Sequence, residues 1–194
     1  FATATDTPGF ESVATVSFTT AGRVEVGGKV VLVMADEPAA QHGWRFTDGA
    51  STSTETSGTS NTPAILFTTP SSSKPTGTAV VYTLSTRTLV FTVGANDLAQ
   101  GASHVFTISN VLTPSSVVGV NNMVATTQDS EDKSVDTTST MSTDQITAGA
   151  LTSASFATAT DTPGFESVAT VSFTTAGRVE VGGKVVLVMA DEPA

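Results

Sequence analysis

Apolar and polar residues alternate along several short stretches of this chain, a pattern typical of β-strands with one buried and one exposed face. In Ser12–Thr20, every second residue from Ala14 to Phe18 is apolar, and hydroxyl residues lie between them. The same period of two recurs in Ser103–Val111, where we expect Phe106 and Ile108 to face inward. Both stretches are therefore predicted to be half-buried strands.

Other stretches predict further strands. Lys29–Asp36 is apolar on both faces, which predicts a strand in the centre of a sheet or one whose outer face is covered by a neighbouring unit. Residues 78–94 predict a hairpin whose two strands face each other across "STRT". The facing residues of this hairpin are Val80, Tyr82 and Leu84 on one strand and Leu89, Phe91 and Val93 on the other. The remaining predicted strands are 64–69 and 123–128, and 43–48 is a short aromatic stretch.

The segments between these strands are rich in Gly, Pro and Ser, and residues 51–63 have the composition of a loop. No stretch shows the 3.6-residue period of a helix over ten or more residues. Short strands at regular spacing predict an all-β protein, an antiparallel Ig-like β-sandwich of about seven to nine strands.

Residues 156–194 repeat residues 1–39 without a single change. The two copies begin 156 − 1 = 155 residues apart, which is the size of a domain rather than of a solenoid unit of roughly 20–50 residues. We therefore expect a tandem repeat with a 155-residue period. The chain then holds the start of one repeat (1–39), its remainder (40–155) and the first quarter of the next repeat (156–194).

Two ways of dividing the repeat fit the sequence. Either 1–155 form one unit, or 156–194 complete a sandwich with 40–155 while 1–39 complete the preceding unit. Consecutive units are either domains joined by a linker, or they share strands, with the first strands of one repeat filling a sheet of its neighbour. The chain begins with Phe rather than Met, so we expect it to be part of a longer protein.

Two phrases, "SFTTAGRVEVGGKVVLVMADEP" and "LVFTVGANDLAQGASHVFTISNVLTPSSVVG", resemble the Thr/Ser-rich tandem-repeat surface proteins of algae and related protists. The resemblance covers most of one repeat and rests on turn-and-strand signatures rather than on site chemistry. It implies Ig-like β-sandwich units in a cell-surface filament, hair or matrix fibre. It supplies no catalytic residues.

Charge and composition narrow the class of protein. The formal net charge is −10, with only eight Lys and Arg against 18 acidic residues. Affinity for nucleic acids comes from Lys and Arg that neutralise phosphates, so we expect no nucleic-acid partner. Thr and Ser number 36 and 22 of the 194 residues, and Cys is absent. This hydroxyl-rich, Lys-poor surface predicts an extracellular or cell-surface protein. No apolar run is long enough to span a bilayer, so we expect no membrane contact within these residues.

The sequence argues against catalysis. The only histidines are His42, in a predicted loop, and His104, on the same strand face as Phe106. We expect His104 to be packed and His42 to be solvated. No nucleophile elbow, zinc-protease motif or phosphate-binding loop is present. We therefore predict that the protein is not an enzyme.

One acidic segment, "DSEDKSVD", is a candidate for a Ca²⁺ site. Its carboxylates are Asp129, Glu131, Asp132 and Asp136, and Ca²⁺ takes roughly six to eight oxygen ligands of this kind. The segment lacks the EF-hand spacing and has Lys133 in its middle, so a solvated acidic loop is the alternative. We expect no other cofactor.

Hydroxyl clusters suggest covalently attached glycans. No Asn-x-Ser/Thr sequence is present, so N-linked glycans are not expected. The clusters are mucin-like in composition, which favours O-glycosylation, and bare loops are the alternative. The candidate positions are Thr52, Thr54, Thr56, Thr59, Pro63, Pro70, Ser71, Ser72, Thr137 and Thr138.

Four residues are candidates for contacts between units. Val31 and Val33 lie on the second apolar face of the predicted strand 29–36. Trp44 and Arg45 belong to residue types that are enriched in interface cores. A tryptophan packed in the core of its own unit is the alternative for Trp44.

Two functions follow from these observations. In the first, the chain is a structural subunit that associates with itself into an extracellular filament of head-to-tail β-sandwich repeats, because a heterologous contact that does not close gives an open filament. In the second, the chain is an adhesive or ligand-binding module in a cell-surface stalk. A filament protein polymerises, whereas a stalk stays a soluble string of domains and binds a ligand saturably.

Overall fold

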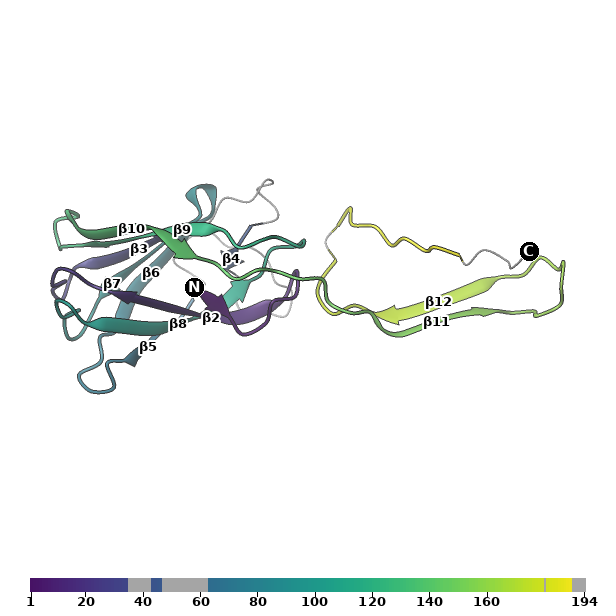
Figure 1. The fold of residues 1–194 in the computed structure, drawn as a ribbon, viewed down its shortest axis with the longest axis horizontal. Helices are drawn as coiled ribbons and strands as arrows, with labels where there is room; N and C mark the ends of the chain where they lie inside the picture. The colour runs from purple at the N-terminus through teal and green to yellow at the C-terminus, as the bar shows by residue number, and fades with distance from the viewer. Residues whose placement is uncertain (35–42, 47–62, 180, 190–194) are drawn as a thin grey trace.

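The computed structural model describes residues 1–34, 43–46, 63–179 and 181–189 (Figure 1). These residues form an all-β structure of antiparallel strands with one short 3-10 turn. The described residues contain no helix that is long and apolar enough to cross a membrane. Most of the predicted loop 51–63 lies outside the described residues, and so does His42.

Ten strands of the described residues form two five-stranded sheets. In the first sheet the order is β1-β2-β8-β4, and β5 also pairs with β8. Its strands are β1 (Ala2–Thr3), β2 (Glu11–Thr19), β4 (Arg45–Phe46), β5 (Ile65–Thr69) and β8 (Ser103–Leu112). In the second sheet the order is β10-β9-β3-β7-β6. Its strands are β3 (Lys29–Val33), β6 (Gly77–Thr83), β7 (Thr88–Val93), β9 (Asn122–Gln128) and β10 (Ser134–Ser142). The turn η1 (Leu84–Thr86) joins β6 to β7.

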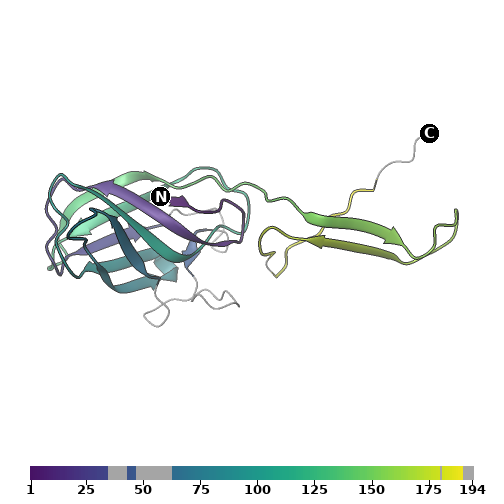
Figure 2. The ribbon, with the colours of Figure 1, turned by 90° about the horizontal axis from the view of Figure 1, so that it is seen from below.

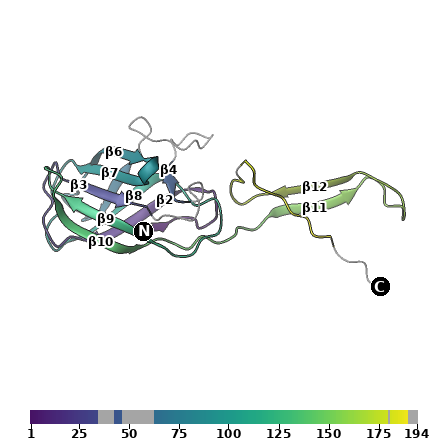
Figure 3. The same ribbon diagram turned by 90° about the horizontal axis from the view of Figure 1, so that it is seen from above.

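Two further views show how these two sheets are arranged (Figures 2 and 3). Buried side chains from both sheets form one apolar core. Phe91 of the second sheet packs edge-on against Phe106 of the first, with ring centroids 5.2 Å apart, and against Phe67 at 6.1 Å. Val16 and Leu32, one from each sheet, have no exposed surface. We call β1–β10 and their connections the two-sheet unit.

Most of the strand predictions are confirmed. Every predicted inward residue of Ser12–Thr20 except Phe18 is buried, and Phe106 and Ile108 are buried in β8. The predicted hairpin is β6–β7, and Tyr82 pairs with Leu89. Strand β3 lies in the centre of its sheet, between β9 and β7, as its two apolar faces predicted.

The predicted strand number was too low. The two-sheet unit has ten described strands rather than seven to nine. Strands β1 and β4 have two residues each, too few to show a period. Strand β10 (Ser134–Ser142) was not predicted, and its first three residues belong to the acidic segment for which a solvated loop was the alternative. It pairs with β9 as an edge strand, where a polar sequence is tolerated because only one of its edges is paired.

The two identical segments, here called the first copy (1–39) and the second copy (156–194), occupy different places. The first copy provides β1 and β2 to one sheet and the central strand β3 to the other. The second copy, together with the last four residues of the remainder, forms a separate two-stranded sheet, β11 (Thr152–Thr158) with β12 (Ala169–Thr174). In Figures 1–3 this hairpin extends away from one end of the two-sheet unit. Within this chain, therefore, the first copy completes the sheets built by the remainder.

Candidate assembly interface

The hairpin of the second copy has the same register as the hairpin of the first. Ala2 pairs with Thr15 in the first copy, and Ala157 pairs with Thr170 in the second. The amide of Ala4 donates to the carbonyl of Val13 at 3.0 Å, and the equivalent amide of Ala159 donates to Val168 at 2.9 Å. The hairpin therefore forms whether or not another strand covers it.

The turns of the two copies also agree. Gly9 and its equivalent Gly164 have φ of 64° and 71°. Gly27 and its equivalent Gly182 have φ of 93° and 89°. Side chains with a Cβ rarely adopt such values, so glycine at these positions fixes the turns locally.

Equivalent apolar side chains are buried in the first copy and exposed in the second. In the first copy, Val30 and Leu32 are fully buried and Met34 is 3% exposed. Their equivalents Val185, Leu187 and Met189 are 60%, 54% and 62% exposed. Val185 and Leu187 lie in 184–188, which forms no strand, whereas the same sequence in the first copy is β3. Met189 follows directly after this segment. The second copy thus exposes to solvent an apolar face whose identical counterpart is buried in the first copy. Exposed apolar faces of this kind mark interaction sites.

The surface that covers the first copy is formed by strands of the remainder. Strand β2 pairs with β8 from Glu11 to Thr19, and β3 pairs with β7 on one side and β9 on the other. Between β2 and β3, Val24 exchanges backbone hydrogen bonds of 2.9 Å with Leu98.

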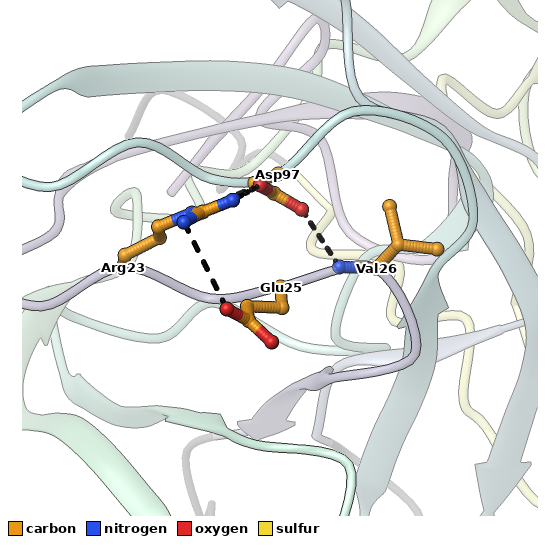
Figure 4. Close-up of polar contacts among 4 residues, drawn as sticks. All are labelled: Arg23, Glu25, Val26 and Asp97. Atoms are coloured by element: carbon orange, nitrogen blue, oxygen red, sulfur yellow. Dashed lines mark hydrogen bonds and ion pairs between the residues drawn. The ribbon is translucent and has the colours of Figure 1, made fainter.

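Carboxylates of the remainder hold the turn between β2 and β3. Asp97 accepts hydrogen bonds from the Arg23 guanidinium, with Nε at 2.9 Å, and from the amide of Val26 at 2.9 Å (Figure 4). Asp136 accepts from the amides of Ala21 and Gly22 at 3.2 and 3.0 Å. We call β7, β8 and β9 together with Asp97, Asp132 and Asp136 the docking surface.

The Arg23–Asp97 pair shifts both ionisable groups. Hydrogen bonds from Arg23, and next from the Val26 amide, lower the pKa of Asp97. The same carboxylate raises the pKa of Arg23, first through the hydrogen bond and then through charge. Glu25 adds a longer ion pair to Arg23 at 3.8 Å. Both side chains are therefore charged in the folded protein at neutral pH.

Among the described residues, the turn at Gly177–Arg178 of the second copy contacts the two-sheet unit. The amide of Arg178 donates to the carbonyl of Gly9 at 3.2 Å. A Cβ on Gly177 would lie only 1.9 Å from the carbonyl oxygen of Pro8, so the two backbones approach as closely as glycine allows. An open hollow beside this contact is lined by Thr7, Ser115, Leu151, Ala176 and Val179, among others. We call the Pro8–Gly9 and Gly177–Arg178 contact the joint.

The acidic segment is not gathered around a metal position. Asp129 accepts the amides of Glu131 and Lys133 at 2.9 Å each, which closes a local turn. Asp132 forms an ion pair with Lys29 of the first copy, and Asp136 binds the turn described above. Among the described residues, no three acidic or histidine side chains come together to hold a metal ion. Two of the four candidate ligands thus hold the first copy.

The glycosylation candidates differ in accessibility. Ser71, Ser72 and Thr137 are exposed, and Pro70 and Thr138 are half-buried. Pro63 is buried, so this fold leaves no room for a glycan on its ring. Thr52, Thr54, Thr56 and Thr59 lie outside the described residues.

The candidate contact residues fall into two groups. Val31 and Val33 lie half-buried on the face of β3 opposite the core. Trp44 is fully buried and packs edge-on against Phe1 at 5.1 Å, and Arg45 is 3% exposed. Trp44 is therefore a core residue of its own unit, but the ring it contacts belongs to the first copy. Its Nε1 has no hydrogen-bond partner among the described atoms.

His104 is packed, as predicted. It lies on β8 with 1% of its surface exposed, 6.0 Å from the Phe18 ring and 6.5 Å from Phe67. Burial lowers its pKa, and a contact between Nε2 and the Ala99 carbonyl at 3.5 Å opposes that shift. The neutral imidazole is the form that this core accommodates.

Sequence reasoning missed the docking carboxylates and the joint. Asp97 lies 74 residues from Arg23, so no local pattern relates them. Charge gave no signal either, because the first copy has more acidic residues than Arg and Lys. Comparison with known proteins adds no partner: no family model, curated protein or solved structure matches the chain.

Proposed function

We propose that this chain is a structural subunit of an extracellular, O-glycosylated filament built from Ig-like β-sandwich repeats in a head-to-tail array with a 155-residue period. The main support for this proposal is that the second copy exposes Val185, Leu187 and Met189, although their equivalents are buried in the first copy. A face with this composition is stable when a remainder equivalent to 40–155 covers it. The next repeat of the array supplies that cover.

The joint gives the array its direction. It connects the Pro8–Gly9 turn of one unit to the Gly177–Arg178 turn at the start of the next. Two different surfaces meet, so the contact is heterologous, and its repetition produces an open filament rather than a closed ring. Each unit then touches mainly its neighbours, and stability is the sum of unit and interface terms.

Glycans belong on the outside of this filament. Ser71 and Ser72 follow β5 in an exposed loop, and Thr137 lies on the edge strand β10. The acidic net charge keeps such a surface soluble and repels neighbouring filaments.

Electron microscopy of native material with helical reconstruction tests the proposal. The expected result is a regular fibre whose axial repeat holds one two-sheet unit per 155 residues, with extra density branching from hydroxyl side chains. Isolated flexible strings of domains with bare loops would contradict the filament and favour an adhesive stalk.

A further inference from the structure

We propose that the docking surface accepts either copy, and that the second copy of the same chain replaces the first copy on it when the first is disabled. The occupant is thus a named segment of this chain, residues 156–194. The inference goes beyond the proposed function, because it concerns a single chain and holds whether or not a fibre forms.

The two copies offer the docking surface identical residues. The docking surface distinguishes its occupant by apolar side chains on β2 and β3 and by donors in the turn between them. The second copy has the same residue at each of these positions: Val171 for Val16, Leu187 for Leu32 and Arg178 for Arg23. Once docked, it makes the same ladder with β8, β7 and β9 and the same bonds to Asp97 and Asp136. The contact free energies of the two occupants are therefore equal.

The second copy is already partly shaped for docking. Its β11–β12 hairpin has the register of the docked β1–β2 hairpin, and its two glycine turns have the docked φ values. Docking therefore costs less backbone conformational entropy than it would for an unstructured segment. Two parts must change: 184–188 must pass from an exposed segment to a strand between β7 and β9, and 152–155 must leave their pairing with β12 to serve as linker.

The linker before the second copy is long enough for this segment to reach the docking surface. The nitrogen of Phe1 donates to the carbonyl of Ser142 at 3.1 Å, so the first copy starts beside the end of β10. The linker stays near β1 up to Thr147, whose amide donates to the Asp6 carbonyl at 2.9 Å. The path back from Asp6 to Phe1 is at most roughly 18 Å, and the eight residues after Thr147 span up to roughly 26 Å. The second copy can therefore begin where the first copy begins.

These distances also identify which chain supplies the replacement. A segment tethered by a short flexible linker has an effective concentration in the millimolar range. At micromolar protein concentration, the chain's own second copy therefore docks far more often than the second copy of another molecule.

Matched substitutions in the two copies test the proposal. Val16 is fully buried against the docking surface, and its equivalent Val171 is exposed. Val16→Asp is expected to remain a folded monomer with a cooperative unfolding transition close to that of the parent chain, because the intact second copy takes its place. Val171→Asp is expected to match the parent chain, and the double variant is expected to lose the transition.

Size-exclusion chromatography with light scattering and urea unfolding would decide among the outcomes. A Val16→Asp chain as unfolded as the double variant would overturn the proposal. A Val16→Asp chain that folds only as concentration-dependent oligomers would also overturn it, because the occupant would then come from another molecule. Either failure leaves the filament intact, since covalently linked units need no replacement.

A disulfide trap gives an independent readout. Thr15 pairs with Thr107 of β8, and Thr170 is the equivalent of Thr15. In the Val16→Asp chain, Thr107→Cys with Thr170→Cys is expected to form an intramolecular disulfide. The matched control in the parent chain is Thr107→Cys with Thr15→Cys. The chain contains no other cysteine, so the product is unambiguous. Failure of the first pair under conditions that oxidise the control would contradict the proposal.

Discussion

The first and second copies are the same 39 residues in two surroundings, and only part of their structure is shared. Both form the same hairpin and the same glycine turns. Only the first copy forms the third strand, β3, while 184–188 stay without strand pairing. The hairpin is therefore determined by residues that are close together in sequence, whereas β3 depends on strands that are distant in sequence.

The contrast has a simple physical cause. The residues that pair in β11–β12 are close in sequence, so closing the hairpin costs little loop entropy. Strand β3 is satisfied only between β7 and β9, which follow it by dozens of residues. Without these two strands its amides and carbonyls bond to water, and its apolar side chains remain exposed.

The largest expected effect comes from removing the same core side chain in both copies. Leu32→Ala with Leu187→Ala is expected to lower the free energy of unfolding by about 2–5 kcal/mol, because whichever copy is docked leaves a cavity. Leu187→Ala alone is expected to change it by less than about 0.5 kcal/mol, since Leu187 is exposed in the parent chain. Urea unfolding measures both. A large loss from Leu187→Ala alone would contradict the assigned difference in burial.

A pH-dependent effect is expected where the first copy covers His104. Burial lowers the pKa of His104 below its ordinary value of about 6.5. As the pH falls through that value, the unfolded chain takes up a proton that the folded chain does not, so stability decreases until the lower folded pKa is reached. Urea unfolding between pH 7.5 and pH 5 measures the slope, and His104→Gln removes the part due to this residue. An unchanged slope in that variant would show that His104 is not the group responsible.

The joint offers a smaller effect, on orientation rather than on stability. Gly177→Ala places a methyl group against the Pro8 carbonyl and is expected to displace the second copy from the unit. The free energy of unfolding is expected to change by less than about 0.5 kcal/mol, because the two sheets are untouched. Small-angle X-ray scattering measures the change in shape. Gly119→Ala is the control, since nothing lies within 4 Å of its added Cβ. Identical scattering from the two variants would count against the joint.

The smallest effect on folding is expected from charging the exposed face. Val185→Lys with Leu187→Lys is expected to leave the unfolding transition unchanged and to reduce the binding of a hydrophobic dye. The physical reason is that both side chains contact solvent in the second copy. Dye fluorescence at matched protein concentration measures this. Undiminished dye binding would place the exposed apolar surface elsewhere on the chain.

The hydrophobic pattern predicted much of the fold and little of the interface. Alternation placed Phe106 and Ile108 in the core, and two apolar faces placed β3 in the centre of a sheet. Strand β10 was missed because its Thr and Ser residues are equally typical of loops. Here pairing with β9, rather than an apolar face, determines the structure.

The acidic segment shows why site chemistry was harder to predict. Asp132 and Asp136 lie close in sequence, which suggested a shared metal ion. In the fold, Asp132 pairs with Lys29 and Asp136 binds the turn at Gly22, so each serves a different part of the first copy. The partners come from more than 100 residues away, and nothing local reveals them.

Amide hydrogen exchange followed by NMR distinguishes the two surroundings of the repeated sequence. One sequence is a protected strand where the remainder covers it and an exposed segment where it does not. Identical residues in different surroundings give separate resonances, so the two copies are observed in one sample. We expect slow exchange for Val30–Val33 and fast exchange for Val185–Val188. Equal protection of the two segments would contradict this expectation.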